Sequence, residues 1–333
     1  MGYIKNIAIV GATGTIGSRI VSEFLAQGKH TITAITRTDS NAHIPPGVNI
    51  AKVDYSDPTS LVVALRGHQA LIITLPPASE GIQGQLVDAA AEADISYIVT
   101  NGWGFDKTHI SAEDVLGPGQ QAINKRIEEL GMSWIEFVSG FWYEFSLARG
   151  VNTFGFDFEQ KTVLFLDEGT ARINVATWEQ TAQAVVKVFT LKEFPDNEQD
   201  EDNSLSRLKN TNIYFKSFLV SQKDMFESVL RVTGDRREDW KVSYETSENR
   251  FKSGQQILQQ GDRTGFMRLM YARMFYPEET GDGSGAFEHW GKLLNEELGL
   301  PREDFDERTK VALEGAKDFT RFGLVSSAYS SLS

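Results

Sequence analysis

The chain has 333 residues, 41% of them hydrophobic and 24% charged, and these proportions exclude a collagen-like or wholly disordered protein. Its 33 Lys and Arg against 46 Asp and Glu give a net charge of −13, which opposes binding to nucleic acid or to an anionic membrane surface. The absence of Cys excludes disulfides, thiolate nucleophiles, iron–sulfur clusters and thiolate zinc sites, and with only five scattered His residues we expect no metal site.

No apolar stretch approaches the roughly 18–20 residues that a membrane-spanning helix needs. The apolar run at residues 7–10 is short, ends at Gly11 and is not followed by a signal-peptide cleavage pattern. We therefore expect a cytoplasmic protein, and the length predicts about two structural units at ~150 residues each.

Short apolar runs alternate with helical stretches over the first 140 residues. The runs are rich in β-branched or aromatic residues, and the stretches between them have apolar residues at helical spacing. The predicted strands are 4–10, 31–36, 48–53, 70–75, 97–100 and 134–138. The predicted helices are 16–27, 58–66, with Asp57 as its N-cap, 82–93 and about 118–130. Because parallel strands need crossover connections, this alternation predicts a doubly wound α/β parallel sheet.

The second half of the sequence alternates less regularly. Its predicted strands are 162–166 and 211–215, and its predicted helices are 177–189, 222–232, 267–275 and 287–298. Residues 195–203 have five carboxylates and no apolar side chain except a proline, so we expect a solvated surface loop there.

Three glycines, Gly11, Gly14 and Gly17, follow the first strand directly and open the first helix. At this turn of a βαβ unit, a pyrophosphate can meet backbone N–H groups and the positive end of a helix. We therefore predict a dinucleotide site, and a tight turn without a ligand is the alternative. The residues of this turn expected to bind the cofactor are Gly11, Thr13, Gly14, Thr15, Ile16 and Gly17.

The end of the second predicted strand indicates which dinucleotide is bound. A carboxylate there would accept the ribose hydroxyls of NAD, but the sequence has Arg37, flanked by Thr36 and Thr38. A guanidinium can donate a planar pair of hydrogen bonds to a 2′-phosphate, so we predict NADP(H). The alternative is a solvated Arg, because Asp39 lies nearby.

The ends of the later strands supply further candidates by position alone. Asp54 and Tyr55 follow the third strand, where an adenine would lie. The ribose and nicotinamide would pass the ends of the fourth and fifth strands. The cofactor-binding candidates there are Thr74, Leu75, Pro76, Asn101 and Trp103.

Aromatic residues gather at the ends of the fifth and sixth strands. Phe105, Phe141 and Trp142 are our candidates for binding a flat apolar substrate by offset stacking. An ordinary core at the seam of two domains is the alternative interpretation.

These features together resemble the NmrA-like and isoflavone reductase-like branch of the atypical short-chain dehydrogenases. The resemblance rests on IAIVGATGTIGSRIV, on the strand that ends at Arg37, on GMSWIEFVSGFWYEF and on WEQTAQAVVKVF. It implies a Rossmann domain with a smaller C-terminal substrate lobe and NADPH as the cofactor. Residues 1–150 are expected to form the NADP-binding domain, with 172–192 and about 210–217 returning to it, and 151–171 and 218–333 to form an α+β lobe.

The proton donor of the family is missing at its expected place. No Tyr precedes a Lys by four residues, the acid pair of ordinary short-chain dehydrogenases, and the Lys of the resembling reductases corresponds to Gln120. Gln cannot titrate, although it can orient a carbonyl or a water. We name Gln120, Lys107 and Tyr143 as catalytic candidates, with His109 as a further loop donor; each is open to a structural interpretation.

Three functions remain open. The leading hypothesis is an NADPH-dependent oxidoreductase that transfers hydride to an aromatic or polyketide-like small molecule. The second is a non-catalytic NADP(H)-sensing regulator with a protein partner. The third is a lyase, isomerase or cyclase that uses the fold without a redox step.

Overall fold

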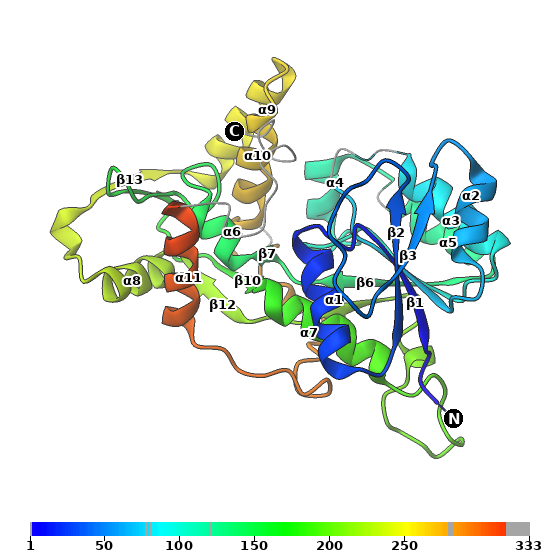
Figure 1. The fold of residues 1–333 in the computed structure, drawn as a ribbon. Helices are drawn as coiled ribbons and strands as arrows, with labels where there is room; N and C mark the ends of the chain where they lie inside the picture. The colour runs from blue at the N-terminus through cyan, green and yellow to red at the C-terminus, as the bar shows by residue number, and fades with distance from the viewer. Residues whose placement is uncertain (1, 77–78, 80, 120, 279–282, 318–333) are drawn as a thin grey trace.

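The computed structural model describes residues 2–76, 79, 81–119, 121–278 and 283–317. A seven-stranded sheet forms the larger part of the molecule (Figure 1), in the order β11-β6-β5-β4-β1-β2-β3. Every neighbouring pair of these strands is parallel. The strands are β1 (Asn6–Val10), β2 (Thr31–Arg37), β3 (Asn49–Val53), β4 (Ala70–Ile73), β5 (Tyr97–Val99), β6 (Ser133–Val138) and β11 (Thr211–Tyr214). The doubly wound Rossmann fold expected from the sequence is confirmed.

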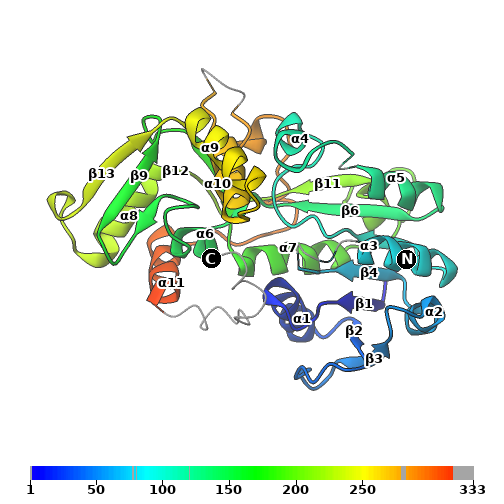
Figure 2. The same cartoon turned by 90° about the horizontal axis from the view of Figure 1, so that it is seen from above.

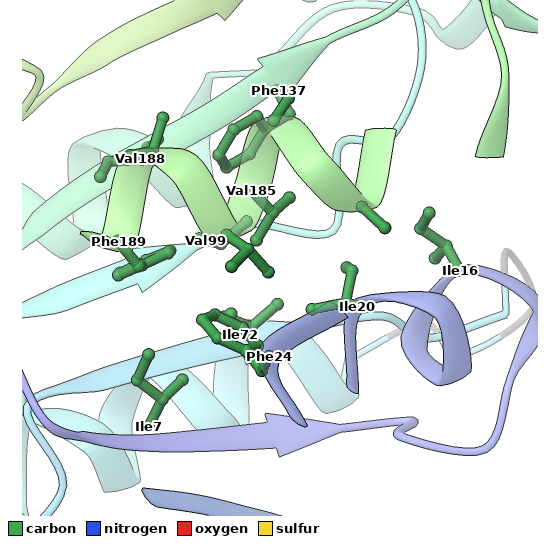
Figure 3. Close-up of a cluster of buried hydrophobic side chains, with 14 of the residues drawn as sticks. Ile7, Ile16, Ile20, Phe24, Ile72, Val99, Phe137, Val185, Val188 and Phe189 are labelled. Atoms are coloured by element: carbon green, nitrogen blue, oxygen red, sulfur yellow. The ribbon is translucent and has the colours of Figure 1, made fainter. Parts of the chain in front are cut away.

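Helices cover both faces of this sheet because successive strand residues point to opposite faces. On β1, Ile7 and Ile9 pack with α1 (Thr15–Gln27) and α7 (Trp178–Thr190). Figure 3 shows this core, with Phe24 of α1 beside Phe189 of α7. Ala8 and Val10 belong to the opposite core. Its helices are α2 (Pro58–Leu65), α3 (Ile82–Glu92) and α5 (Ala122–Glu129).

A second lobe lies beside the carboxyl ends of the strands (Figure 2). It has one sheet of β12 (Phe218–Ser221), β10 (Arg172–Ala176) and β7 (Phe141–Trp142), and another of β13 (Lys241–Glu245), β9 (Thr162–Leu166) and β8 (Phe156–Asp157). Its helices are α6 (Tyr143–Ala148), α8 (Gln222–Thr233), α9 (Ser247–Gln259), α10 (Thr264–Met274) and α11 (Phe305–Lys317). An aromatic-rich core fills it, including Phe154, Phe156, Phe165 and Phe226.

Local capping explains several helix starts. Asp57 accepts a hydrogen bond from the Thr59 N–H and Pro58 takes the first helical position, as predicted. Ser221 and Asp224 form a reciprocal capping box that begins α8. In the acidic stretch at 195–203, which has neither helix nor strand, Asp196 pairs with Lys192 at 3.3 Å.

The predicted helix at 287–298 is wrong. Only Phe287–His289 form a short 3-10 turn. The chain then follows β11, where the Leu294 N–H donates to the Tyr214 carbonyl at 2.8 Å and the Asn295 side chain bonds both backbone groups of Lys216. These hydrogen bonds hold the segment against the end of β11, and the local bonds that it keeps, such as that from the Leu298 N–H to the Leu294 carbonyl, form turns instead of a continuous helix.

Other boundaries also differ from the prediction. The helix expected at 118–130 begins only at Ala122, and a separate α4 (Ile110–Leu116) precedes it. Gly117 and Gly119 have φ of 78° and 85°, which separates the two helices. Of the segments expected to return to the first domain, β11 pairs with β6 and α7 packs on α1, while β10 lies in the lobe. No helix in the described ranges has the length and apolarity to cross a membrane.

Candidate functional site

The glycine turn between β1 and α1 is packed too closely for side chains at two of its positions. Gly11 has φ of 78°, and a Cβ there or at Gly17 would lie 2.7 Å from Thr74 Oγ1. At Gly17 it would also overlap the Gly11 carbonyl oxygen. Thr74, at the end of β4, fixes the turn because its hydroxyl donates to the carbonyls of Val10 and Gly11, at 2.8 and 3.1 Å. Two glycines are therefore required by the contact with β4.

The start of α1 is left open for an anion. Gly14 is its N-cap and no side chain caps the helix, whose first turn also has no acidic residue. Thr13 and Gly14 are exposed, and Thr15 is half-buried. A phosphate fits here because the first N–H groups of a helix lack partners within the helix and its N-terminus is electropositive.

Arg37 ends β2 with an exposed guanidinium, 69% accessible, and lies 3.5 Å from the Asp39 carboxylate. It is free to turn toward a ligand phosphate, because an exposed ion pair contributes little. Burial raises the pKa of the nearby Tyr55, and the charge of Arg37 opposes that shift. Asp54 instead holds its own turn: bonds from the Ser56 hydroxyl and N–H, at 2.6 and 2.8 Å, lower the pKa of its carboxyl.

Hydrogen bonds join the residues that follow β4 and β5, and three of the candidates take part in them: Leu75, Asn101 and Trp103. The Asn101 side chain accepts a bond from the Leu75 N–H at 2.9 Å and donates to the Leu75 carbonyl at 3.1 Å. The Trp103 indole donates to the Ile73 carbonyl and stacks on Phe137. Pro76 is exposed beside them. These polar groups shape the edge of the site by holding β4 and β5 together.

Tyr143 lies far from solvent. Its hydroxyl hydrogen-bonds Thr309 of α11 at 2.6 Å, and burial raises the pKa of the phenol. Its ring packs against Phe154, Phe218 and Phe305 in the lobe core. In this arrangement it contacts no solvent-accessible space. Gln120, the remaining catalytic candidate, lies outside the described residues.

Lys107 and His109 lie in the loop after β5. The Lys107 side chain is 17% exposed, and its Nζ is 3.7 Å from Oε1 of Glu136. His109 caps α4 by accepting a bond from the Ser111 N–H, and its ring stacks on Trp290 at 4.4 Å. The Lys107 side chain thus keeps some exposure to solvent, while the His109 ring is held by Ser111 and Trp290.

Glu136 is a functional candidate that the sequence reading missed. It occupies the middle of β6, is 1% exposed, and accepts a hydrogen bond from the Thr100 hydroxyl at 3.1 Å. Burial raises the pKa of this carboxyl, and Lys107 opposes that shift. The available signal was a carboxylate within the otherwise apolar run at 134–138, since central parallel strands are ordinarily apolar throughout.

Asp106 anchors the same loop. One carboxylate oxygen accepts from the Thr108 N–H at 2.7 Å and from the Asn212 amide at 2.9 Å. The other accepts from the Tyr214 hydroxyl at 2.8 Å and from the Trp290 indole at 3.1 Å. The backbone next to Lys107 is thereby tied to β11 and to the segment after α10.

The three substrate-binding candidates differ in their surroundings. Phe141 is buried and stacks on Tyr271 of α10 at 3.9 Å. Trp142 is partly exposed, and its indole N–H has no hydrogen-bond partner among the described residues. Phe105 is partly exposed and packs against the lobe core. Trp142 and Phe105 therefore retain surface that a ligand can contact.

The parallel sheet, its glycine turn and the uncapped α1 define a dinucleotide-binding Rossmann protein. The chain belongs to the NmrA-like family, whose model matches residues 4–260.

A curated relative, oxidoreductase aprR of Aspergillus flavus, is 26% identical over 319 residues, which cover 93% of this chain and 99% of the relative. Among solved structures, AtPrR2 with NADP+ and (+)pinoresinol superposes with a TM-score of 0.67 at 16% identity, covering 94% of this chain and 100% of that one. An isoflavone reductase gives 0.68 at 15% identity, covering 92% and 98%. The structural likenesses show the shared fold.

Proposed function

We propose that this protein is an NADPH-dependent reductase of the isoflavone reductase type that acts on an aromatic or polyketide-like small molecule. The observation that carries the proposal is the glycine turn: Gly11 and Gly17 pack without room for a Cβ, and the N-terminus of α1 is uncapped. The similarity to oxidoreductase aprR and the fold shared with NADP+-bound AtPrR2 support it.

The choice of NADPH over NADH rests on Arg37. Arg37 is the last residue of β2, the position at which NAD-specific Rossmann proteins carry a carboxylate. Asp54, which follows β3, is engaged by Ser56, and Asp39 forms only an exposed ion pair with Arg37. A 2′-phosphate placed beside β2 can therefore bind the exposed Arg37 guanidinium in place of Asp39.

Bound NADPH would supply a hydride to an electrophilic carbon of the substrate. The start of α1 would hold the pyrophosphate, and the joined ends of β4 and β5 would form the floor beside the nicotinamide. Trp142 and Phe105 would offer aromatic surface to the substrate. Lys107 would donate the accompanying proton, since Tyr143 is enclosed in the lobe core.

An NADP(H)-sensing regulator with a protein partner is the second candidate. Gln120 favours it, because the resembling reductases carry a titrating Lys at that position and Gln has no proton to give.

The first experiment is calorimetric titration of the purified protein with NADPH, NADP+ and NADH. NADPH consumption is then followed with benzylideneacetone and cinnamaldehyde as probe enone and aldehyde. Tight NADPH binding with turnover supports the reductase. Tight binding without turnover favours the sensor, and absence of binding removes both.

Replacing Arg37 with Glu should weaken NADPH binding by about tenfold to 100-fold, because a charge-assisted hydrogen bond contributes roughly 1.5–3 kcal/mol. NADH affinity should change little, since NADH lacks the 2′-phosphate. Calorimetry of both nucleotides measures the difference. Arg236→Glu, which makes the same charge change on the exposed surface of the lobe, is the control. An equal loss for both nucleotides would contradict the role of Arg37 in phosphate recognition.

A further inference from the structure

A buried carboxyl group, that of Glu136, lies near the carboxyl ends of β5 and β6. Val99 of β5 pairs with Ile135 of β6, which brings Glu136 beside the loop that leaves β5. That loop returns along β6, where Gly104 pairs with Val138. The Glu136 side chain is therefore covered by the segment that carries Lys107.

The enclosure of Glu136 is close. A Cβ on Gly102 would lie 2.5 Å from the Glu136 carboxyl carbon, so the loop backbone passes directly against this carboxyl group. On the opposite side, the Asn124 amide of α5 lies 3.5 Å from Glu136 Oε2. Such a carboxyl has lost its hydration and needs compensation from its neighbours.

Only one of the two Glu136 carboxylate oxygens receives a hydrogen bond that compensates for the lost hydration. Oε2 accepts the bond from Thr100, whereas Oε1 has no hydrogen-bond partner among the described residues. The Lys107 Nζ is 3.7 Å from Oε1, a distance at which the charges interact without a formed hydrogen bond. The buried oxygen therefore faces the ammonium of a side chain that is 17% exposed.

The two carboxylates around Lys107 have different tasks. Asp106 ties the backbone of the loop through its bonds to Asn212, Tyr214 and Trp290. Glu136 faces the ammonium itself. A long side chain held at both its base and its tip loses little further freedom when it acts on a ligand.

We propose that Glu136 is a positioning residue that holds the Lys107 ammonium at the carboxyl edge of the sheet, where Lys107 donates the proton that accompanies hydride transfer. This inference rests on the proposed reductase function. The substrate gains a hydride at carbon from NADPH, which becomes NADP+, and a proton from Lys107 at the oxygen of its carbonyl or enone group. The neutral Lys107 amine then takes a proton from water.

The positioning is tested without turnover by brief acetylation of the folded protein with acetic anhydride and peptide-level mass spectrometry. In Glu136→Gln, which keeps the shape of the side chain, Lys107 should label several-fold faster than in the wild type, because the paired ammonium is released. Labelling is normalised to Lys125, whose side chain is 78% exposed. An unchanged ratio would overturn the pairing.

The kinetic test separates positioning from structure. Glu136→Gln should lower kcat by about tenfold or more while KM and the NADPH Kd stay within about twofold. Lys107→Met should lower kcat by about 100-fold, and the double variant should be no slower than Lys107→Met, since both changes act through one proton donor. Lys107→Arg should keep KM without restoring kcat, because a guanidinium stays charged.

Asp235→Asn is the matched control. It removes a carboxylate 2.6 Å from Lys161 in the lobe, so it should speed the labelling of Lys161 and leave kcat unchanged.

Faster labelling of Lys107 in Glu136→Gln with unchanged kcat would overturn the catalytic part of the proposal. Absence of wild-type turnover with both probes would overturn the reductase function and the proton-donor role, while labelling would still decide whether Glu136 holds Lys107. An unchanged NADPH Kd shows that the variants are folded.

Discussion

Replacing Glu144 with Gln is expected to raise the free energy of unfolding at pH 7 by on the order of 3 kcal/mol. Glu144 is fully buried at the start of α6, and neither carboxylate oxygen has a hydrogen-bond partner among the described residues. Burial raises the pKa of this carboxyl from 4.5 to about 8, and the nearby Glu179 adds to the shift. The Arg308 guanidinium lies 3.9 Å away but also contacts Glu179 and Glu303.

The sign of the pH dependence follows from proton binding. Between pH 4.5 and about 8, folded Glu144 keeps a proton that the unfolded chain has released, because its pKa is raised. The contribution of this residue is therefore most favourable below pH 4.5, and it falls by about 1.4 kcal/mol per pH unit across that window. Gln is neutral throughout, so the variant and the wild type should have similar stability near pH 4.5 and diverge as pH rises.

Urea unfolding of both proteins at several pH values from about 5 to 8 measures this difference. Glu179→Gln is the control, since Glu179 pairs with the same Arg308 but has a half-exposed side chain. An exposed pair of this kind contributes about 1 kcal/mol or less. A difference between Glu144→Gln and the wild type that does not change with pH would mean that Glu144 is ionised in the folded protein.

Replacing Gly17 with Ala is expected to lower the free energy of unfolding by about 2–3 kcal/mol and to weaken NADPH binding by about tenfold or more. The added Cβ would overlap the Gly11 carbonyl oxygen and crowd the Thr74 hydroxyl. Because Thr74 is held by two hydrogen bonds to the turn, the overlap must move the N-terminus of α1 away from β4. Urea unfolding and NADPH calorimetry measure the two effects.

Gly14 provides the comparison within the same turn. Its added Cβ would meet only the Gly11 carbonyl oxygen, at 3.2 Å. Gly14→Ala should therefore cost under about 1 kcal/mol of unfolding free energy. Ala favours a helix more than Gly does, so helix propensity cannot destabilise the Gly17 variant. Equal destabilisation by the two substitutions would contradict the contact with β4 as the cause of the cost.

The sequence by itself was sufficient for features that depend on neighbouring residues. The alternation of apolar runs and helical stretches predicted the doubly wound sheet, because periodicity and crossover length are local properties. Asp57 followed by Pro58 predicted the start of α2 for the same reason. The glycine turn was predicted because Gly11, Gly14 and Gly17 follow a predicted strand and open a predicted helix, although its need for glycine also comes from Thr74, which follows the distant β4.

The tertiary structure alone decided which side chains reach solvent and which distant groups meet. Tyr143 follows a strand, as an active-site residue would, but α11 packs against its ring and its hydroxyl hydrogen-bonds Thr309 of that helix. Residues 287–298 have a helical pattern of apolar side chains, yet the Leu294 N–H bonds the Tyr214 carbonyl at the end of β11 and the segment forms turns instead of a helix. Glu136 and Lys107 belong to different segments, and the pairing of β5 with β6 brings them together. Burial and long-range pairing depend on the whole chain, so no local pattern specifies them.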